Sequence, residues 1–284
     1  MNHFGETLRK IRENLALSQA ELSSGIMTQS NYSKVEQGKI DIPFSKMVAV
    51  LDRVGMSVEE FLYIHHDYSN IQRHTLLNLT NLNYNDVSKL KKYKNEMKKI
   101  QNPTVREIEL LAIYEALILI AEKEDYESAR KKVSFIWNRL EKYNEWYLYD
   151  IRLINNILYI FPIETATSIV HSALKQLQKY SSLRGVNNLT ASIRVNFITL
   201  LMKEGKMTKA LREIEKLISY CIQKNLLILL GICYIRKGLL LQLLNKGNTQ
   251  EWFQKGNLLL DSVQANGIKS ELEKEILQYT TNKP

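Results

Sequence analysis

A short segment near the N-terminus carries a cluster of polar side chains that could hydrogen-bond to the edges of DNA bases. Glutamine and asparagine can pair with adenine through two hydrogen bonds, and lysine can reach guanine or a phosphate. Tyr32 and Val35 leave the other face of the segment apolar at helical spacing, so that it can pack on a neighbouring helix. We therefore expect a recognition helix that enters the major groove. Its expected base contacts are Gln29, Ser30, Asn31, Ser33 and Lys34.

Four side chains that flank this segment could hold it on the phosphate backbone. Ser18 and Gln19 open the preceding helix, where main-chain amides and the helix dipole favour a phosphate. Gln37 and Lys39 lie at the other end of the recognition helix. We expect all four to contact DNA phosphates.

The net charge of +9 does not by itself support DNA binding, because it is not concentrated in this segment. Residues 1–70 hold seven Lys and Arg against nine Asp and Glu, a net charge of minus two. The expectation of DNA contact therefore rests on the residue pattern and not on charge.

Residues 4–64 supply the elements that position these side chains, because their pattern predicts five short helices separated by tight turns. Ser18 is the predicted N-cap of the helix before the recognition helix, and Thr28 is that of the recognition helix itself. Gly38 and Gly55 are predicted to follow the ends of the third and fourth helices, where a left-handed residue is needed.

The chain beyond Pro103 repeats with a period of 42 residues. The dipeptide Ile-Arg recurs at this interval, beginning at Ile151, Ile193 and Ile235. Helical periodicity with such a repeat is typical of an α-solenoid, in which hairpins of two helices stack on one another. We expect about four hairpins. The turns that open the following helices keep the same interval, at Glu164, Lys206 and Asn248.

The expected architecture is therefore all-α and has three parts. Residues 1–66 form a five-helix helix-turn-helix domain, and residues 67–104 form a linker and a first helix. Residues 105–284 form the helical-repeat domain.

Equivalent positions of a solenoid line up along one surface, so the arginines of the repeated dipeptide could form a cationic row. Such a row could hold the carboxylates or carbonyls of an extended peptide. An asparagine one turn further on could donate to and accept from a peptide backbone. The alternative is that each arginine bridges or caps adjacent repeats. The expected peptide contacts are Arg152, Asn155, Arg194, Asn196, Tyr234 and Arg236.

Other classes of function find no support in the sequence. The five histidines show no metal-ligand spacing, and Cys221 and Cys233 are expected to be buried free thiols. No Gly-rich phosphate loop or nucleophile motif is present, so we expect no enzyme, no cofactor and no metal site. The longest uncharged apolar stretch, Leu226 to Ile235, is about half of the ~20 residues needed to cross a bilayer. The N-terminus shows no export signal, and we expect a cytoplasmic protein without a membrane partner.

The segment SQAELSSGIMTQSNYSKVEQGK resembles the helix-turn-helix domains of the Cro and phage-repressor class, a likeness that covers residues 4–64. Arg12 and Glu36 match positions that form a partly buried salt bridge in that class, so the resemblance gives both a structural role. The interval from Leu22 to Glu36 is one residue shorter than in most of the class. With the continuation SKMVAVLDRVGMSVEEF and a helical C-terminal domain, the chain is similar to the Rgg/GadR/MutR regulators of Gram-positive bacteria.

This resemblance implies a homodimer and a tetratricopeptide-like domain for ligand sensing and dimerisation. We therefore expect a sequence-specific transcriptional regulator that binds double-stranded DNA and holds a short signalling peptide in the concave groove of its repeats. One alternative is a helical-repeat protein-binding adaptor whose DNA binding is secondary. Another is a regulator of the same family that responds to no peptide.

Overall fold

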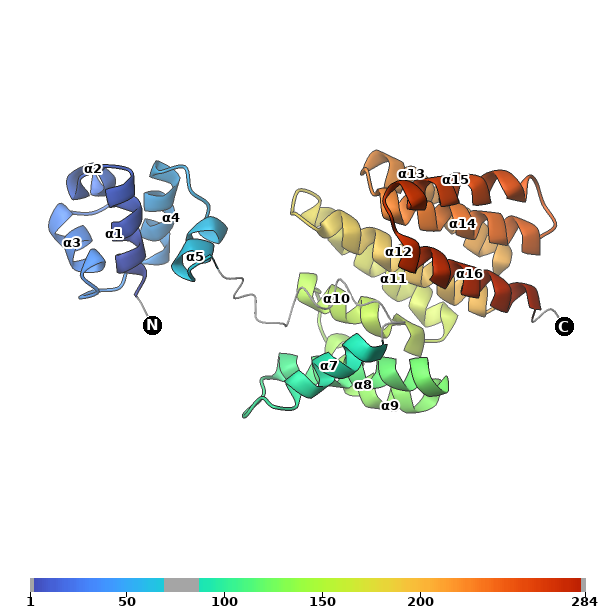
Figure 1. Ribbon diagram of the computed structural model, residues 1–284. Coiled ribbons are helices and arrows are strands. Elements are labelled where there is room, and N and C mark those ends of the chain that lie inside the picture. Colours follow the sequence, from blue (N-terminus) through green and yellow to red (C-terminus); the bar gives the residue numbers. More distant parts are fainter. Residues whose placement is uncertain (1–2, 69–86, 282–284) are drawn as a thin grey trace. The chain divides into compact units, whose positions relative to one another are not determined.

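The computed structural model describes residues 3–68 and 87–281, which are helical and contain no strand in these ranges (Figure 1). The all-α prediction is confirmed. The chain divides into two compact units, one within Met1–His74 and the other within Thr75–Pro284. Most of the linker expected between them, residues 69–86, lies outside the described residues.

The first unit packs five short helices around one apolar core. The core is built from buried side chains of every helix, among them Leu8, Leu22, Tyr32, Leu51 and Phe61. The helices are α1 (Phe4–Asn14), α2 (Gln19–Ser23), α3 (Gln29–Glu36), α4 (Phe44–Arg53) and α5 (Val58–His65).

Local capping fixes where α2 and α3 begin and end. The Ser18 hydroxyl accepts from the main-chain amide of Glu21, whose carboxylate accepts in return from the amide of Ser18, so the two residues form a capping box. The Thr28 hydroxyl accepts from the amide of Asn31 at the start of α3. Gly38, just past the end of α3, has a φ of +69°, as predicted.

Gly5 lets α1 approach α3 closely. A Cβ at this position would lie 1.8 Å from the carbonyl oxygen of Val35, so a side chain here would push the two helices apart. This close approach sets the depth at which α3 is seated on α1.

The second unit is a row of helical hairpins, most of which share one continuous core, with a smaller cluster at the C-terminal end around Ile235, Leu260 and Leu272 (Figure 1). Residues 67–104 are predicted from the sequence to hold a linker and a first helix. The helix α7 within that range packs on α8 and buries Leu90 and Met97 in the shared core. The helices are α7 (Val87–Met97), α8 (Val105–Lys123), α9 (Tyr126–Leu140), α10 (Leu148–Ile157), α11 (Ile163–Leu177), α12 (Val186–Lys203), α13 (Met207–Gln223), α14 (Leu227–Leu243), α15 (Thr249–Ser262) and α16 (Asn266–Thr281).

The 42-residue period appears as physical contacts between equivalent positions. The Lys206 ammonium donates to the Glu164 carboxylate at 3.0 Å, and the Lys209 ammonium donates to the Thr167 hydroxyl at 3.4 Å, each across 42 residues of sequence. Lys206 and Asn248 are the N-caps of α13 and α15. Glu164 lies instead in the first turn of α11, which begins after Pro162.

The isoleucine of each Ile-Arg dipeptide is buried in a core. Ile151, Ile193 and Ile235 expose at most 3% of their surface. Because successive residues of a helix point about 100° apart, the arginine that follows each isoleucine is turned partly out of the core. The repeat therefore sets the arginines at equivalent positions of α10, α12 and α14.

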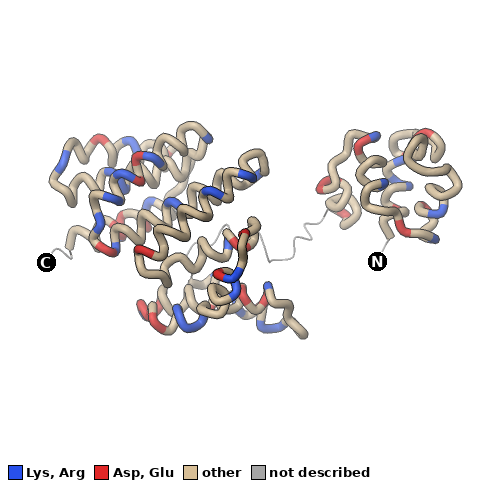
Figure 2. Tube along the Cα trace, turned by 180° about the vertical axis from the view of Figure 1, so that it is seen from behind, with Lys and Arg blue, Asp and Glu red and all other residues tan. Residues whose placement is uncertain are grey.

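Lys and Arg are spread over the helices of the second unit, with Asp and Glu among them (Figure 2). Cys221 and Cys233 are buried free thiols, as predicted. Within residues 3–68 and 87–281 we find no group of His, Cys, Asp or Glu that could hold a metal ion. None of the helices described is both long enough and apolar enough to span a bilayer.

Candidate functional site

The helix α3 presents a polar outer face and an apolar inner face. Tyr32 and Val35 are buried against the core, exposing 0% and 3% of their surface. Ser33 is half-buried, and the other side chains of the outer face are exposed: Gln29, Ser30, Asn31 and Lys34. The predicted base-contacting side chains therefore share the accessible side of one short helix.

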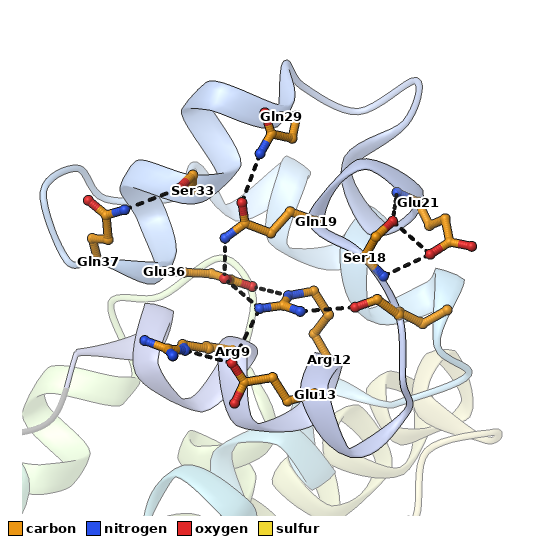
Figure 3. Close-up of polar contacts among 11 residues, drawn as sticks. Arg9, Arg12, Glu13, Ser18, Gln19, Glu21, Gln29, Ser33, Glu36 and Gln37 are labelled. Atoms are coloured by element: carbon orange, nitrogen blue, oxygen red, sulfur yellow. Dashed lines mark hydrogen bonds and ion pairs between the residues drawn. The ribbon is translucent and has the colours of Figure 1, made fainter.

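Arg12 and Glu36 form the ion pair that the resemblance implied, between α1 and α3 (Figure 3). The Arg12 guanidinium donates from Nε to Glu36 Oε1 at 2.6 Å and from Nη2 to Oε2 at 3.0 Å. Its Nη1 donates to the carbonyl of Leu17 at 2.9 Å. The side chain of Glu36 is only 2% exposed. The hydrogen bond with Glu36 raises the pKa of Arg12, although burial acts against the charged form.

Gln19 joins this ion pair to the outer face of α3 (Figure 3). Its amide nitrogen donates to Glu36 Oε2 at 2.7 Å, and its amide oxygen accepts from the Gln29 side chain at 2.9 Å. The sequence predicted that Gln19 contacts a phosphate. In the structure its side chain lies between the buried carboxylate and the first residue of α3, where it can position Gln29, and the phosphate contact stays a prediction.

The other predicted phosphate contacts differ in whether their side chains form hydrogen bonds within the protein. The Ser18 hydroxyl donates to the Glu21 carboxylate at 2.7 Å within the capping box. The Gln37 amide donates to the Ser33 hydroxyl at 3.2 Å, and Lys39 is exposed.

The start of α4 is a helix N-terminus that the sequence analysis did not single out. Its N-cap residue, Pro43, makes no side-chain cap hydrogen bond, so no side-chain oxygen satisfies the first amides of the helix. Phe44, Ser45 and Lys46 are all exposed in that first turn. Amides at a helix start favour a phosphate, and the proline that cannot cap was the available signal.

Arg53, also missed, holds α2 in place. Its Nη1 donates to the carbonyl oxygens of Glu21 and Leu22 at 3.1 Å and of Ser24 at 2.5 Å. These are carbonyls at the C-terminal end of α2, which the helix itself leaves unsatisfied.

The three repeat arginines lie in three different environments. Arg236 donates from Nε and Nη2 to the Glu275 carboxylate of α16 at 3.1 and 3.0 Å. Arg194 approaches Glu213 no closer than 3.9 Å. Arg152 has no acidic partner in the part of the chain that the structure describes, and burial lowers its pKa.

Each of the three arginines also keeps a buried N–H group without a hydrogen-bond partner among the described residues. The groups are Nε of Arg152, Nε of Arg194 and Nη1 of Arg236. A buried donor without an acceptor is costly, so these positions favour an additional acceptor.

The two predicted asparagines are in contact with each other. The Asn196 amide donates to the side-chain oxygen of Asn155 at 2.9 Å and to its main-chain oxygen at 3.2 Å. This contact joins α10 to α12. Tyr234 lies apart from them and packs on Trp252 of α15, with ring centroids 5.5 Å apart.

Comparison with known protein families finds a match for each of the two units. Residues 87–255, more than half of the chain, match the family model described as the C-terminal domain of the HTH-type transcriptional regulator Rgg. Residues 8–61 match the helix-turn-helix model.

Three solved structures have the same fold over nearly the whole chain. A putative transcriptional regulator from Listeria monocytogenes is 19% identical, with a TM-score of 0.78 and 100% of both chains covered. The pheromone receptor Rgg2 (C45S) of Streptococcus dysgalactiae is 16% identical, with a TM-score of 0.70, covering 99% of this chain and 100% of that one. PlcR of Bacillus thuringiensis, solved in complex with the peptide PapR7 and DNA, is 20% identical, with a TM-score of 0.69 and coverages of 96% and 99%.

The structural likenesses establish the fold, and the family-model matches establish the family. The chain belongs to the Rgg family of DNA-binding, helix-turn-helix transcriptional regulators.

Proposed function

We propose that this Rgg-family regulator reads its operator through the outer face of α3 and that a short signalling peptide controls this binding. Gln29 and Asn31 are the proposed base readers, with Ser30, Ser33 and Lys34 beside them. Lys39, Gln37 and the first turns of α2 and α4 are the proposed phosphate anchors. The site of action is chromosomal DNA in the cytoplasm.

The network behind α3 supports the assignment of Gln29. A base-reading side chain must be held close to its bonding geometry before DNA arrives, because ordering it on binding costs free energy. Arg12, Glu36 and Gln19 form a chain of hydrogen bonds that ends on Gln29.

Two copies of the chain are proposed to bind together. One helix-turn-helix unit with a net negative charge makes too few phosphate contacts for the affinities of about 10⁻⁸ M or better that specific regulators reach. A homodimer doubles those contacts and places two recognition helices on half-sites about one helical turn apart.

The observation that carries the peptide proposal is the unpaired guanidinium of Arg152. It is partly buried on α10, has a buried Nε–H without an acceptor, and has no carboxylate beside it among the described residues. The carboxylate of a peptide would satisfy both the charge and the donor. PlcR, whose fold the chain shares, was solved with a peptide and DNA bound.

A second candidate, a regulator of this family that responds to no peptide, is favoured by the other two arginines. Arg236 is paired with Glu275, and Arg194 faces Glu213 and the ring of Tyr220. Contacts of this kind are what arginines with a purely structural role would make.

Reversing two of the charges separates these candidates. In the double variant Arg152→Glu with Arg194→Glu, affinity for a responsive peptide should fall about tenfold or more, because two donors become repulsive carboxylates. Basal DNA binding should not change. Fluorescence polarisation would be measured with labelled peptides drawn from small open reading frames beside the gene.

The matched control is Arg184→Glu with Arg212→Glu, which makes the same change of charge at two exposed positions. It should leave peptide affinity as it was. If a peptide binds the parent and the first double variant equally well, the arginines are structural and the peptide proposal in this form is wrong. If no peptide binds the parent, the peptide-independent regulator is favoured.

A further inference from the structure

Arg236, the last of the three repeat arginines, differs from Arg152 and Arg194 because it forms an ion pair with a carboxylate from outside its own hairpin. Arg194 of α12 faces Glu213 of α13, the second helix of the same hairpin. Arg236 of α14 takes Glu275 from α16, the helix that follows the last hairpin. Both side chains of this pair are largely covered, 13% and 18% exposed. The pair is therefore a tertiary contact that fixes α16 on the repeat.

The helix α16 is otherwise poorly packed. Of its described residues only Leu272 is buried, and Leu277 is 61% exposed. Between α14, α15 and α16 lies an open pocket of about 300 Å³, which is lined by Ile235, Phe253 and Leu272 together with polar side chains. The apolar side chains at the edge of this pocket lack part of the contact that a filled interface between the three helices would give them. Apolar packing alone therefore holds α16 weakly.

The C-terminal turns of α16 also reach beyond the last repeat. Tyr279 packs on the main core of the solenoid. Burial, and then Glu275, raise the pKa of Tyr279 to about 12, and its other electrostatic neighbours are Arg236 and Tyr126. Tyr126 begins α9, and its hydroxyl accepts from the Lys203 ammonium at the end of α12. One face of α16 thus meets Arg236 together with residues of earlier hairpins.

We propose that α16 can detach from the last repeat, and we call it a latch for this reason. While the latch is closed, the Glu275 carboxylate binds Arg236. When it opens, an acidic group of a bound ligand binds Arg236 in place of Glu275. This inference rests on the proposed ligand-sensing function, because it assigns the last arginine to the same row as Arg152 and Arg194. The remaining buried Nη1–H of Arg236 shows that Glu275 leaves part of the guanidinium unsatisfied. Glu275 accepts both hydrogen bonds from Arg236 on a single oxygen, whereas a carboxylate or sulfonate of a bound ligand can accept them on two oxygens.

Hydrogen exchange on the full-length protein tests the latch without any ligand. In Glu275→Gln the amides of residues 266–281 should exchange about tenfold faster or more, because the charge-assisted hydrogen bonds that close the helix are weakened. The amides of α13 should exchange as in the parent. Glu273→Gln is the matched control, since Glu273 is an exposed carboxylate on the same helix.

An apolar anion then tests whether Glu275 holds the place of a ligand. Anilinonaphthalene sulfonate combines an aromatic surface with a sulfonate, and should bind Glu275→Gln about fivefold tighter or more than the parent. Adding Arg236→Gln to that variant should remove the gain. This second comparison separates binding at the arginine from general exposure of apolar surface.

Three results would overturn the proposal. Unchanged exchange in Glu275→Gln would show that the pair does not hold α16. Faster exchange with unchanged probe affinity, or a gain that survives Arg236→Gln, would show that Glu275 occupies no anion site. Neither measurement uses a peptide or DNA, so the absence of a peptide response would count against the proposed function and not against the latch.

Discussion

Replacing Arg12 by alanine is expected to destabilise the helix-turn-helix unit by about 3–5 kcal/mol, because Glu36 is left as a buried charge without its cation. The side chain of Glu36 is 2% exposed, so in the parent protein Arg12 and its other neighbours shield this carboxylate from water. The amide of Gln19 would remain as one neutral donor. Thermal unfolding followed by circular dichroism, with hydrogen exchange of α1 to α3, would measure the destabilisation.

Two further variants show whether the destabilisation comes from the unpaired charge. Arg9→Ala removes an arginine from the same helix, but its partner Glu13 is exposed, so its melting should resemble that of the parent. Arg12→Met with Glu36→Gln removes both charges and should recover most of the stability. An Arg12→Ala variant that melts like Arg9→Ala would show that the pair contributes little.

Replacing Gln29 and Asn31 together by alanine is expected to weaken operator binding by about 1–3 kcal/mol for each base that is no longer read, which is roughly fivefold to 150-fold per residue. The fold should be unaffected, because both side chains are exposed on α3. Gel-shift titration at one fixed salt concentration would give the affinities, since phosphate contacts make binding strongly dependent on salt.

Asn14→Ala is the control for this double variant, because Asn14 is exposed at the end of α1 and outside the recognition helix. Its affinity for the operator should equal that of the parent. If the Gln29 and Asn31 variant keeps full operator affinity with its helices intact, α3 does not read bases through these residues.

The parts of the fold that sequence predicted well depend on short-range chemistry. Ser18 and Thr28 begin helices because their hydroxyls reach amides two or three residues ahead, and Gly38 follows a helix end because it tolerates positive φ. Such signals lie within one turn of the chain. The period of 42 residues could also be read from the sequence, because each repeat places the same residue types at equivalent positions of its helices.

The parts that sequence missed depend on contacts between distant segments. Gln19 has the residue type and position of a phosphate contact, and only the approach of α3 gives it Glu36 and Gln29 as partners. The spacing of the repeat treated Arg152, Arg194 and Arg236 as equivalent. Arg236 finds its carboxylate on α16, a helix outside the repeat, whereas Arg194 faces Glu213 within its own hairpin, and no period in the sequence could show that difference.

The start of α4 and the role of Arg53 were missed for a related reason. The three carbonyls that Arg53 contacts lie about thirty residues earlier in the sequence. A free helix end and a capping side chain can be recognised only when the two helices are seen side by side. The family resemblance supplied the Arg12–Glu36 pair, which the spacing alone did not.

Selection of bound sequences from a random pool of duplex DNA tests the central claim most directly. The purified full-length parent should recover one motif as two half-sites, centred about 10–10.5 base pairs apart or a multiple of this. With Asn31→Ala, the preference for one base should disappear in each half-site while the spacing is kept. Recovery of no shared motif, of a single half-site, or of an unchanged motif with Asn31→Ala would contradict operator reading by paired α3 helices.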